Sequence, residues 1–229
     1  MAVNKGLLRE KEDYQKLILE HLQNDNGYII RSAKNDFNSG LAMDTELLFT
    51  FFRDTQKEAF EKLEKTYKNK TQETVFNLIN NEINKKNRGL IDVLKNGVDF
   101  GNGVKLNLMY RQPATSFNKK LNELYSKNIL SVMEEVYHKE KERIDLVIFL
   151  NGLAIFTIEL KCNATGQNVE DAIKQYKKRD YKTRTFTFKS GVLAVFAMDM
   201  KEVYMCTNLK GASSFFLPFN KGHSSIFDR

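Results

Sequence analysis

Hydrophobic residues in the first hundred positions recur at helical spacing. Between positions 9 and 23, a face at i, i+3, i+4, i+7 and i+8 is formed by Tyr14, Leu17, Ile18, His21 and Leu22. Asp44 is predicted to cap a second, long helix that continues to Leu63, because an aspartate there can accept a hydrogen bond from the first turn. Further helical patterns cover 75–83 and 90–96, the latter ending at Gly97. Residues 1–97 are therefore predicted to form a helical region.

Beyond Gly97 the hydrophobic period shortens to two residues, which is typical of strands. The pattern predicts a hairpin turning on Asn102-Gly103 and strands at 129–137, 144–150, 153–161, 192–197 and 203–207. It also predicts an amphipathic helix at 169–179, whose inner side carries Val169, Ala172, Ile173 and Tyr176. Strands 144–150 and 153–160 are apolar on both faces, as expected of central strands covered by helices on each side. The predicted fold class is α/β (α+β), a mixed central sheet flanked by helices. We interpret 1–229 as a single domain whose sheet-containing core spans 98–229.

Two carboxylates and a lysine interrupt these apolar central strands. Asp145 lies near the start of one strand, and Glu159 and Lys161 lie at the end of the next. A carboxylate in an apolar strand loses its hydration, a cost that is tolerable when the group is paired or binds a cation. Carboxylate oxygens suit Mg²⁺, which keeps several waters and can bind a substrate phosphate. The pattern indicates a Mg²⁺ site at Asp145 and Glu159, with Lys161 orienting a water or stabilising charge on a phosphate.

The turn between the two strands decides whether the acids meet. A two-residue Asn151-Gly152 loop with an uninterrupted ladder would pair Asp145 with Ile158 and put Glu159 on the opposite face. A three-residue loop that also includes Leu150, or an equivalent bulge, would return Glu159 to the face of Asp145. We predict that loop or such a bulge. On spacing alone, a plain ion pair between Glu159 and Lys161 remains the alternative.

Charge and cysteine content narrow the class of protein. The formal net charge is +7, and residues 166–189 hold seven Lys and Arg against three Asp and Glu, an excess that favours a polyanionic partner such as nucleic acid. The two cysteines, Cys162 and Cys206, lack the spacing of a zinc knuckle or a disulfide framework. Since no apolar run of 18 residues occurs, we expect a cytoplasmic protein without a membrane partner.

Several short motifs accompany the predicted strands and the helix after them. They are Ser126-Lys-Asn-Ile-Leu130, Arg143-Ile-Asp-Leu-Val-Ile-Phe-Leu-Asn-Gly-Leu153, Ile158-Glu-Leu-Lys-Cys-Asn163, Thr165-Gly-Gln167 and Asp171-Ala-Ile-Lys-Gln-Tyr176. Together they resemble the N-terminal nuclease domain of type I restriction enzyme R subunits, most densely between positions 90 and 207. The resemblance implies a PD-(D/E)xK nuclease fold with three catalytic residues: Asp145 as the first acid, Glu159 as the second, and Lys161.

The resemblance also implies DNA contacts on the helix at 169–179. The family carries a Gln-x-x-x-Tyr motif there. Gln175 matches it, but Arg179 replaces the tyrosine. The two residues would lie on one helical face at i, i+4, and the guanidinium could hold a phosphate through two N–H groups. An exposed Gln and Arg on a solvated helix is the alternative. The backbone of DNA is expected to contact the lysines of this segment, Lys174, Lys178 and Lys182. Related nuclease folds add an acid from an early helix to the metal site, and Glu20 is the residue we assign to that role.

Two functions follow from these observations. The first is a Mg²⁺-dependent endonuclease domain that cuts double-stranded DNA as the nuclease part of a type I R subunit, with methyltransferase and specificity subunits as partners implied by the resemblance. ATP is expected only for a motor domain, whose GxxxxGK[ST] motif the sequence does not contain, so we expect a nuclease portion without its motor. The alternative is a non-cleaving module with a nuclease-like fold that docks DNA or another subunit.

Overall fold

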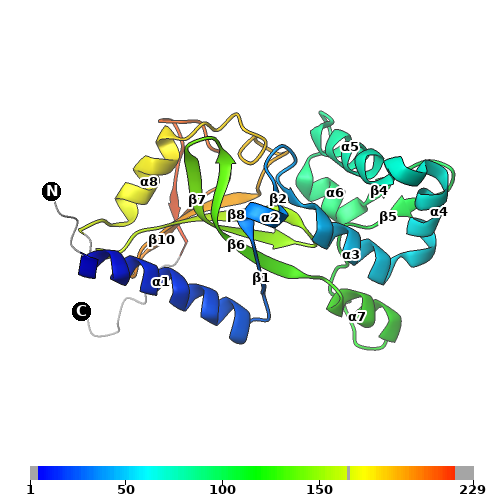
Figure 1. The fold of residues 1–229 in the computed structure, drawn as a ribbon, viewed down its shortest axis with the longest axis horizontal. Coiled ribbons are helices and arrows are strands. Elements are labelled where there is room, and N and C mark those ends of the chain that lie inside the picture. The colour runs from blue at the N-terminus through cyan, green and yellow to red at the C-terminus, as the bar shows by residue number, and fades with distance from the viewer. Residues whose placement is uncertain (1–4, 164–165, 220–229) are drawn as a thin grey trace.

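A mixed β-sheet forms the centre of the molecule. The computed structural model describes residues 5–163 and 166–219, and within them one sheet contains nine strands. Its main path runs β1 (Ile29–Arg31), β6 (Leu130–Lys139), β7 (Glu142–Leu150), β8 (Leu153–Leu160), β9 (Ala194–Met198), β10 (Val203–Cys206) and β11 (Leu217–Pro218). The β1–β6 and β8–β9 pairs are parallel, and the other pairs on this path are antiparallel. The predicted mixed sheet flanked by helices is confirmed (Figure 1).

Helices pack on both faces of this sheet. On one face a hydrophobic core joins Leu48 and Ile79 to Leu146 of β7, and on the other Tyr176 packs with Val147. In Figure 1, α3 to α6 lie at the right end of the molecule and α8 at the left. β7 and β8 are thus covered on both faces, as their apolar sequences predict. The helices are α1 (Lys5–Asn24), α2 (Ala33–Asp36), α3 (Thr45–Thr55), α4 (Lys57–Tyr67), α5 (Thr71–Asn84), α6 (Leu90–Asn96), α7 (Lys119–Ser126) and α8 (Val169–Lys178), with a 3₁₀ turn at Lys68–Lys70.

The long helix predicted after Asp44 is two helices. Asp44 caps α3 by accepting a hydrogen bond of 2.9 Å from the backbone N–H of Leu47, as predicted. The chain leaves the helix at Gln56, whose φ is −142° and whose side-chain amide binds both the N–H and the carbonyl of Asn107. The prediction of one continuous helix was wrong because the break is set by a residue 51 positions away, which apolar spacing does not register.

The first 97 residues are not purely helical, which corrects the predicted division of the chain. β1, β2 (Phe37–Asn38) and β3 (Met43–Asp44) come from this region and join the main sheet. Each has two or three residues, too few for alternation of polar and apolar positions to show. No helix of the described chain is both long and apolar enough to cross a membrane.

The buried face of α1 is rotated from the predicted one. Leu17 is 63% exposed, and His21 is also exposed and pairs with Asp25 four residues later. Gln15 and Leu19 are buried in their place. Helical spacing therefore identified α1 but not all of the residues that face the interior.

After α6, the hairpin predicted to turn on Asn102-Gly103 is present as β4 (Val98–Asp99) and β5 (Lys105–Leu106), with positive φ at both turn residues. Gly97 ends α6 with φ 70°, as its position predicts. This small hairpin packs beside α4 and α5 (Figure 1). It forms a separate two-stranded sheet and does not enter the central one.

A bulge in the β7–β8 hairpin sets the phase of β8. The turn has two residues, Asn151 with φ 50° and Gly152 with φ 84°, so the predicted three-residue loop was wrong. Phe149 pairs with Ala154 but Ile148 pairs with Phe156, which leaves Ile155 as the extra residue. The equivalent bulge that we predicted is thus confirmed. Beyond the bulge, Leu146 pairs with Ile158. Asp145, which precedes Leu146 on β7, therefore adjoins Glu159, which follows Ile158 on β8.

Candidate functional site

The two predicted acids, Asp145 and Glu159, meet at the adjoining ends of β7 and β8. Asp145 is 3% exposed and Glu159 is 1% exposed. An oxygen of the Asp145 carboxylate accepts a hydrogen bond of 2.7 Å from the backbone N–H of Leu160. Burial, and secondarily the negative charge of Asp145, raise the pKa of Glu159 to about 7. A buried acid next to a second acid is a site that favours a bound cation.

Lys161 completes the predicted group of three. Its ammonium lies 4.0 Å from Oε1 of Glu159 and donates a hydrogen bond of 2.6 Å to Oε1 of Gln175 on α8. The amide nitrogen of Gln175 donates to the same Glu159 oxygen. Gln175 therefore touches both the lysine and the second acid, and it fixes them relative to each other. Cys162, the next residue, is buried and not disulfide-bonded.

Arg179 lies at the C-cap of α8, one residue beyond the helix, and faces the acids. Its guanidinium donates to Oε2 of Glu159 and, at 2.5 Å, to the backbone carbonyl of Arg143. The Arg179 side chain is 4% exposed, so it is not displayed on the surface as the expected phosphate contact would require. Its charge lowers the pKa of Glu159 and so opposes part of the effect of burial. This ion pair is the main feature of the site that sequence reasoning missed.

The predicted DNA-contacting lysines lie on the outside. Lys174 is exposed and forms an ion pair of 3.2 Å with Asp171, while Lys178 and Lys182 are exposed near the end of α8. The predicted third acid is elsewhere. Glu20 is half exposed, and its ion pair, of 3.7 Å, is with Lys16 on the same helix. Because the other two acids are buried, this position does not support Glu20 as a ligand of the same metal.

The site offers two carboxylates to a metal ion. Among residues 5–163 and 166–219, no group of three or more His, Cys, Asp or Glu side chains could hold a metal. Mg²⁺ does not require such a group, because it retains several waters and commonly binds one or two carboxylates together with substrate phosphates. The donor set of Asp145 and Glu159 therefore fits Mg²⁺ and does not fit a closed zinc site.

Further buried polar groups support α8 above the acids. The hydroxyl of Tyr176 lies 3.0 Å from that of Thr157, and Asp199 accepts a 2.9 Å hydrogen bond from the N–H of Val169 at the start of the helix. The ring of His138 lies 3.5 Å from the Arg179 guanidinium. Burial, and then the charge of Arg179, lower the pKa of His138 to about 4. Apolar spacing predicted the burial of Tyr176, but nothing in the sequence pairs the other residues.

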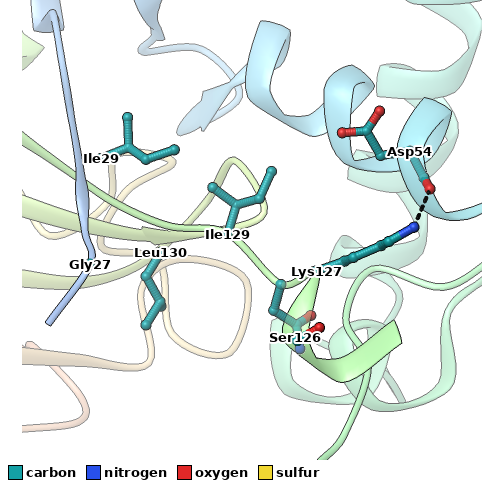
Figure 2. A pocket seen from close by; sticks show the side chains of 8 residues that line it. Gly27, Ile29, Asp54, Ser126, Lys127, Ile129 and Leu130 are labelled. Carbon is teal, nitrogen blue, oxygen red and sulfur yellow. Dashed lines mark hydrogen bonds between the residues drawn. The ribbon is translucent and has the colours of Figure 1, made fainter. Parts of the chain in front are cut away.

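The motif Ser126–Leu130 lies away from this chemistry. It borders a hollow of about 420 Å³ between β1 and the end of α3, where the ammonium of Lys127 donates to the carbonyl of Asp54 at 3.4 Å (Figure 2). Asn128 in this motif binds the backbone of Tyr110 and the side chain of Asn151. The motif thus supports the turn end of the β7–β8 hairpin, opposite to the end that carries the acids.

Comparison with protein families shows the family to which the chain belongs. The family described as Type I restriction enzyme R protein N terminus matches residues 8–214. The chain belongs to this family. The match to the type I R protein N terminus spans α8, all three residues of the predicted triad, and every strand of the central sheet except β11 at its edge. No curated protein matches the chain.

Within the type I R protein N terminus, residue 165 of the Thr165-Gly-Gln167 motif lies outside the described residues. Gln167 is exposed shortly before α8. The motif from Arg143 to Leu153 covers β7 and its turn, and that from Ile158 to Asn163 covers the end of β8. Three of the motifs that carry the resemblance therefore meet around Asp145 and Glu159: Arg143–Leu153, Ile158–Asn163 and Asp171–Tyr176.

Proposed function

We propose that this chain is a Mg²⁺-dependent endonuclease domain that hydrolyses phosphodiester bonds of double-stranded DNA, as the nuclease part of a type I restriction enzyme R subunit. The observation that carries the proposal is the bulge at Ile155, which brings the buried carboxylates of Asp145 and Glu159 together beside Lys161. A plain ion pair between Glu159 and Lys161 would not need a second buried acid. Membership of the R protein N terminus family supports the same function.

Each side chain has a role that its position suits. Asp145 and Glu159 would hold the metal, which when bound polarises the scissile phosphate and favours formation of hydroxide. Lys161 would orient the attacking water or stabilise negative charge on the phosphate. Gln175 is a positioning residue, because its amide joins Lys161 to Glu159. Arg179 favours the ionised form of Glu159, the form that can bind a cation.

The partners we propose follow from the family and the charge. Lys174, Lys178 and Lys182 are exposed on or near α8 and would contact the backbone of duplex DNA without reading its sequence. Sequence recognition would come from the specificity subunit, and the methyltransferase subunit would complete the complex. ATP would be consumed by a motor domain and not by these residues.

Metal binding tests the proposal most directly. Calorimetry with Mn²⁺ should detect a site in the wild-type chain whose affinity falls at least about tenfold in Asp145→Asn, because a neutral amide replaces a carboxylate ligand. Glu73→Gln, which removes an exposed acid of α5, should bind as the wild type does. Lys161→Ala should keep the metal but abolish cleavage of plasmid DNA by the reconstituted complex.

One observation favours the non-cleaving alternative. Glu159 is held by two donors, Gln175 and Arg179, which compete with a cation for its oxygens. If Asp145→Asn and wild type bind Mn²⁺ equally, or if the complex with Lys161→Ala cuts DNA at the wild-type rate, the nuclease proposal fails. A DNA- or subunit-docking module would then be the better description.

A further inference from the structure

A basic cleft adjoins the acids on the side of the β6–β7 turn. Its volume is about 300 Å³. The turn and the end of α8 line it through Lys141, Glu142, Arg143, Gln175, Lys178 and Arg179. The lining therefore contains four cations and one carboxylate. We propose that this basic cleft holds a phosphate of the DNA backbone that flanks the phosphate being cut, an inference that rests on the proposed nuclease function.

The two walls of the basic cleft are bonded to each other. Arg179, at the end of α8, donates to the carbonyl of Arg143 on β7 at 2.5 Å. The N–H of Asp180 donates to Glu142 at 3.2 Å, and Lys139 forms an ion pair of 2.7 Å with Asp180. The β6–β7 turn is thus held against the end of α8 by two hydrogen bonds and an ion pair, made by Lys139, Glu142 and Arg143. The backbone on both sides of the cleft is therefore tied together by these contacts.

The charges of the basic cleft are not balanced within the protein. Its carboxylate, Glu142, is already engaged by His138 at 3.3 Å, by Lys139 at 3.9 Å and by the N–H of Asp180. In the described parts of the chain, neither Lys141 nor Lys178 takes part in an ion pair. The C-terminal end of α8 adds roughly half a negative charge, which is less than the charge of the two lysines. An anion is therefore the ligand that the cleft suits, and a phosphate suits a group of lysines.

The basic cleft is one side chain away from the second acid. Gln175 and Arg179 line the cleft and also donate hydrogen bonds to the Glu159 carboxylate. A phosphate held by Lys141 and Lys178 would therefore place the DNA strand next to the metal ligands. This assigns to the β6–β7 turn, in particular to Lys141 and Arg143, a DNA-binding role that the α8 lysines alone do not supply. Arg143 is 45% exposed and also pairs with Glu135, so Lys141 is the residue of the turn to test together with Lys178.

Duplex binding without catalysis tests the inference. The probe is a fluorescein-labelled DNA duplex, with anisotropy measured in EDTA over a range of salt concentrations. In Lys141→Ala/Lys178→Ala the affinity should fall about tenfold, and the slope of log affinity against log salt should decrease in magnitude by about 0.9, as expected for one lost phosphate contact. The matched control, Lys65→Ala/Lys105→Ala, removes the same charge from α4 and β5 at the opposite end of the molecule (Figure 1). It should change the affinity less than about twofold.

The outcomes separate this inference from the proposed function. Equal losses in the two double variants, an unchanged salt slope, or no duplex binding by the wild type would overturn the role of the basic cleft. Cleavage that still depends on Asp145 and Lys161 would then leave the nuclease proposal standing. If the cleft variant weakens binding as expected but Asp145→Asn keeps full Mn²⁺ affinity, the cleft is retained and the nuclease proposal falls. Circular dichroism of each double variant checks that these substitutions of exposed lysines leave the fold intact.

Discussion

Replacing Arg179 by leucine should destabilise the protein far more than the loss of a surface ion pair. The side chains of Arg179 and Glu159 are 4% and 1% exposed, so the substitution strands a carboxylate in an apolar interior. Breaking a buried pair in this way costs about 3–5 kcal/mol, because the desolvation of the remaining charge is no longer compensated. Gln175 still donates to Glu159, which puts the expected loss at the lower end, about 3 kcal/mol at pH 8.

The same loss should depend on pH, with a defined sign. Glu159 has a folded-state pKa of about 7, above its ordinary value, so the stability linked to its bound proton is lost as pH rises through 7. Without Arg179 this pKa rises further, so the variant continues to lose stability at pH values where the wild type no longer does. At pH 6 the carboxyl is mostly protonated in both proteins, and the difference should shrink to about 2 kcal/mol.

Urea unfolding followed by circular dichroism at pH 6 and pH 8 measures both quantities. Lys57→Leu is the control, since its pair with Glu61 is 4.0 Å long and exposed, and its loss should cost less than about 1 kcal/mol. Adding Glu159→Gln to Arg179→Leu should recover about half of the loss, because the stranded charge is gone. The reasoning is refuted if Arg179→Leu costs no more than Lys57→Leu, or if its cost is the same at both pH values.

Two further predictions concern stability. Since burial and Arg179 lower the pKa of His138 from 6.5 to about 4, the unfolded chain takes up a proton that the folded chain does not, and stability should fall as pH drops from 6.5 toward 4. In His138→Gln the free energy of unfolding, measured by urea titration at several pH values, should fall by about 2–3 kcal/mol less over this pH range than in the wild type. An equal fall in the two proteins would contradict this. Gly152→Ala should cost about 3 kcal/mol or more, because its Cβ would lie 2.4 Å from the carbonyl oxygen of Asp44, whereas Gly103→Ala, with positive φ but open space, should cost about 1 kcal/mol in the same assay. Equal midpoints for the two alanine variants would show that the close approach at Gly152 does not matter.

The parts of the fold that sequence predicted well are those with a long periodic signal. The inner face of α8 follows from four apolar residues at helical spacing, and Tyr176 is buried as expected. β7 and β8 were recognised because six of the nine residues of β7 and six of the eight residues of β8 are apolar. β1 to β3 were missed since segments this short contain no period. β1 and β3 are held in the sheet by pairing with the distant strands β6 and β8, and β2 is held by pairing with β3.

The sequence indicated that two acids and a lysine lie together in the candidate site, but not which hydrogen bonds join the residues around them. Three polar residues stand out in the apolar strands, because burying a polar side chain costs free energy unless it is paired or bound: Asp145, Glu159 and Lys161. The chemistry required a bulge, yet the sequence could not say that it lies at Ile155, because Asn151-Gly152 also suits a normal two-residue turn. Helical spacing placed Gln175 and Arg179 on one face without revealing that both reach the same carboxylate, since that depends on how α8 packs over the sheet.

Both groups that hold Glu159 from above are carried by one end of one helix. Gln175 belongs to the last turns of α8, and Arg179 follows it directly. Gln175 donates to one oxygen of the Glu159 carboxylate and Arg179 to the other, so the packing of this single helix end covers both oxygens that a cation would occupy. Lys161, carried by the chain after β8 and not by the helix, lies beside the same acid.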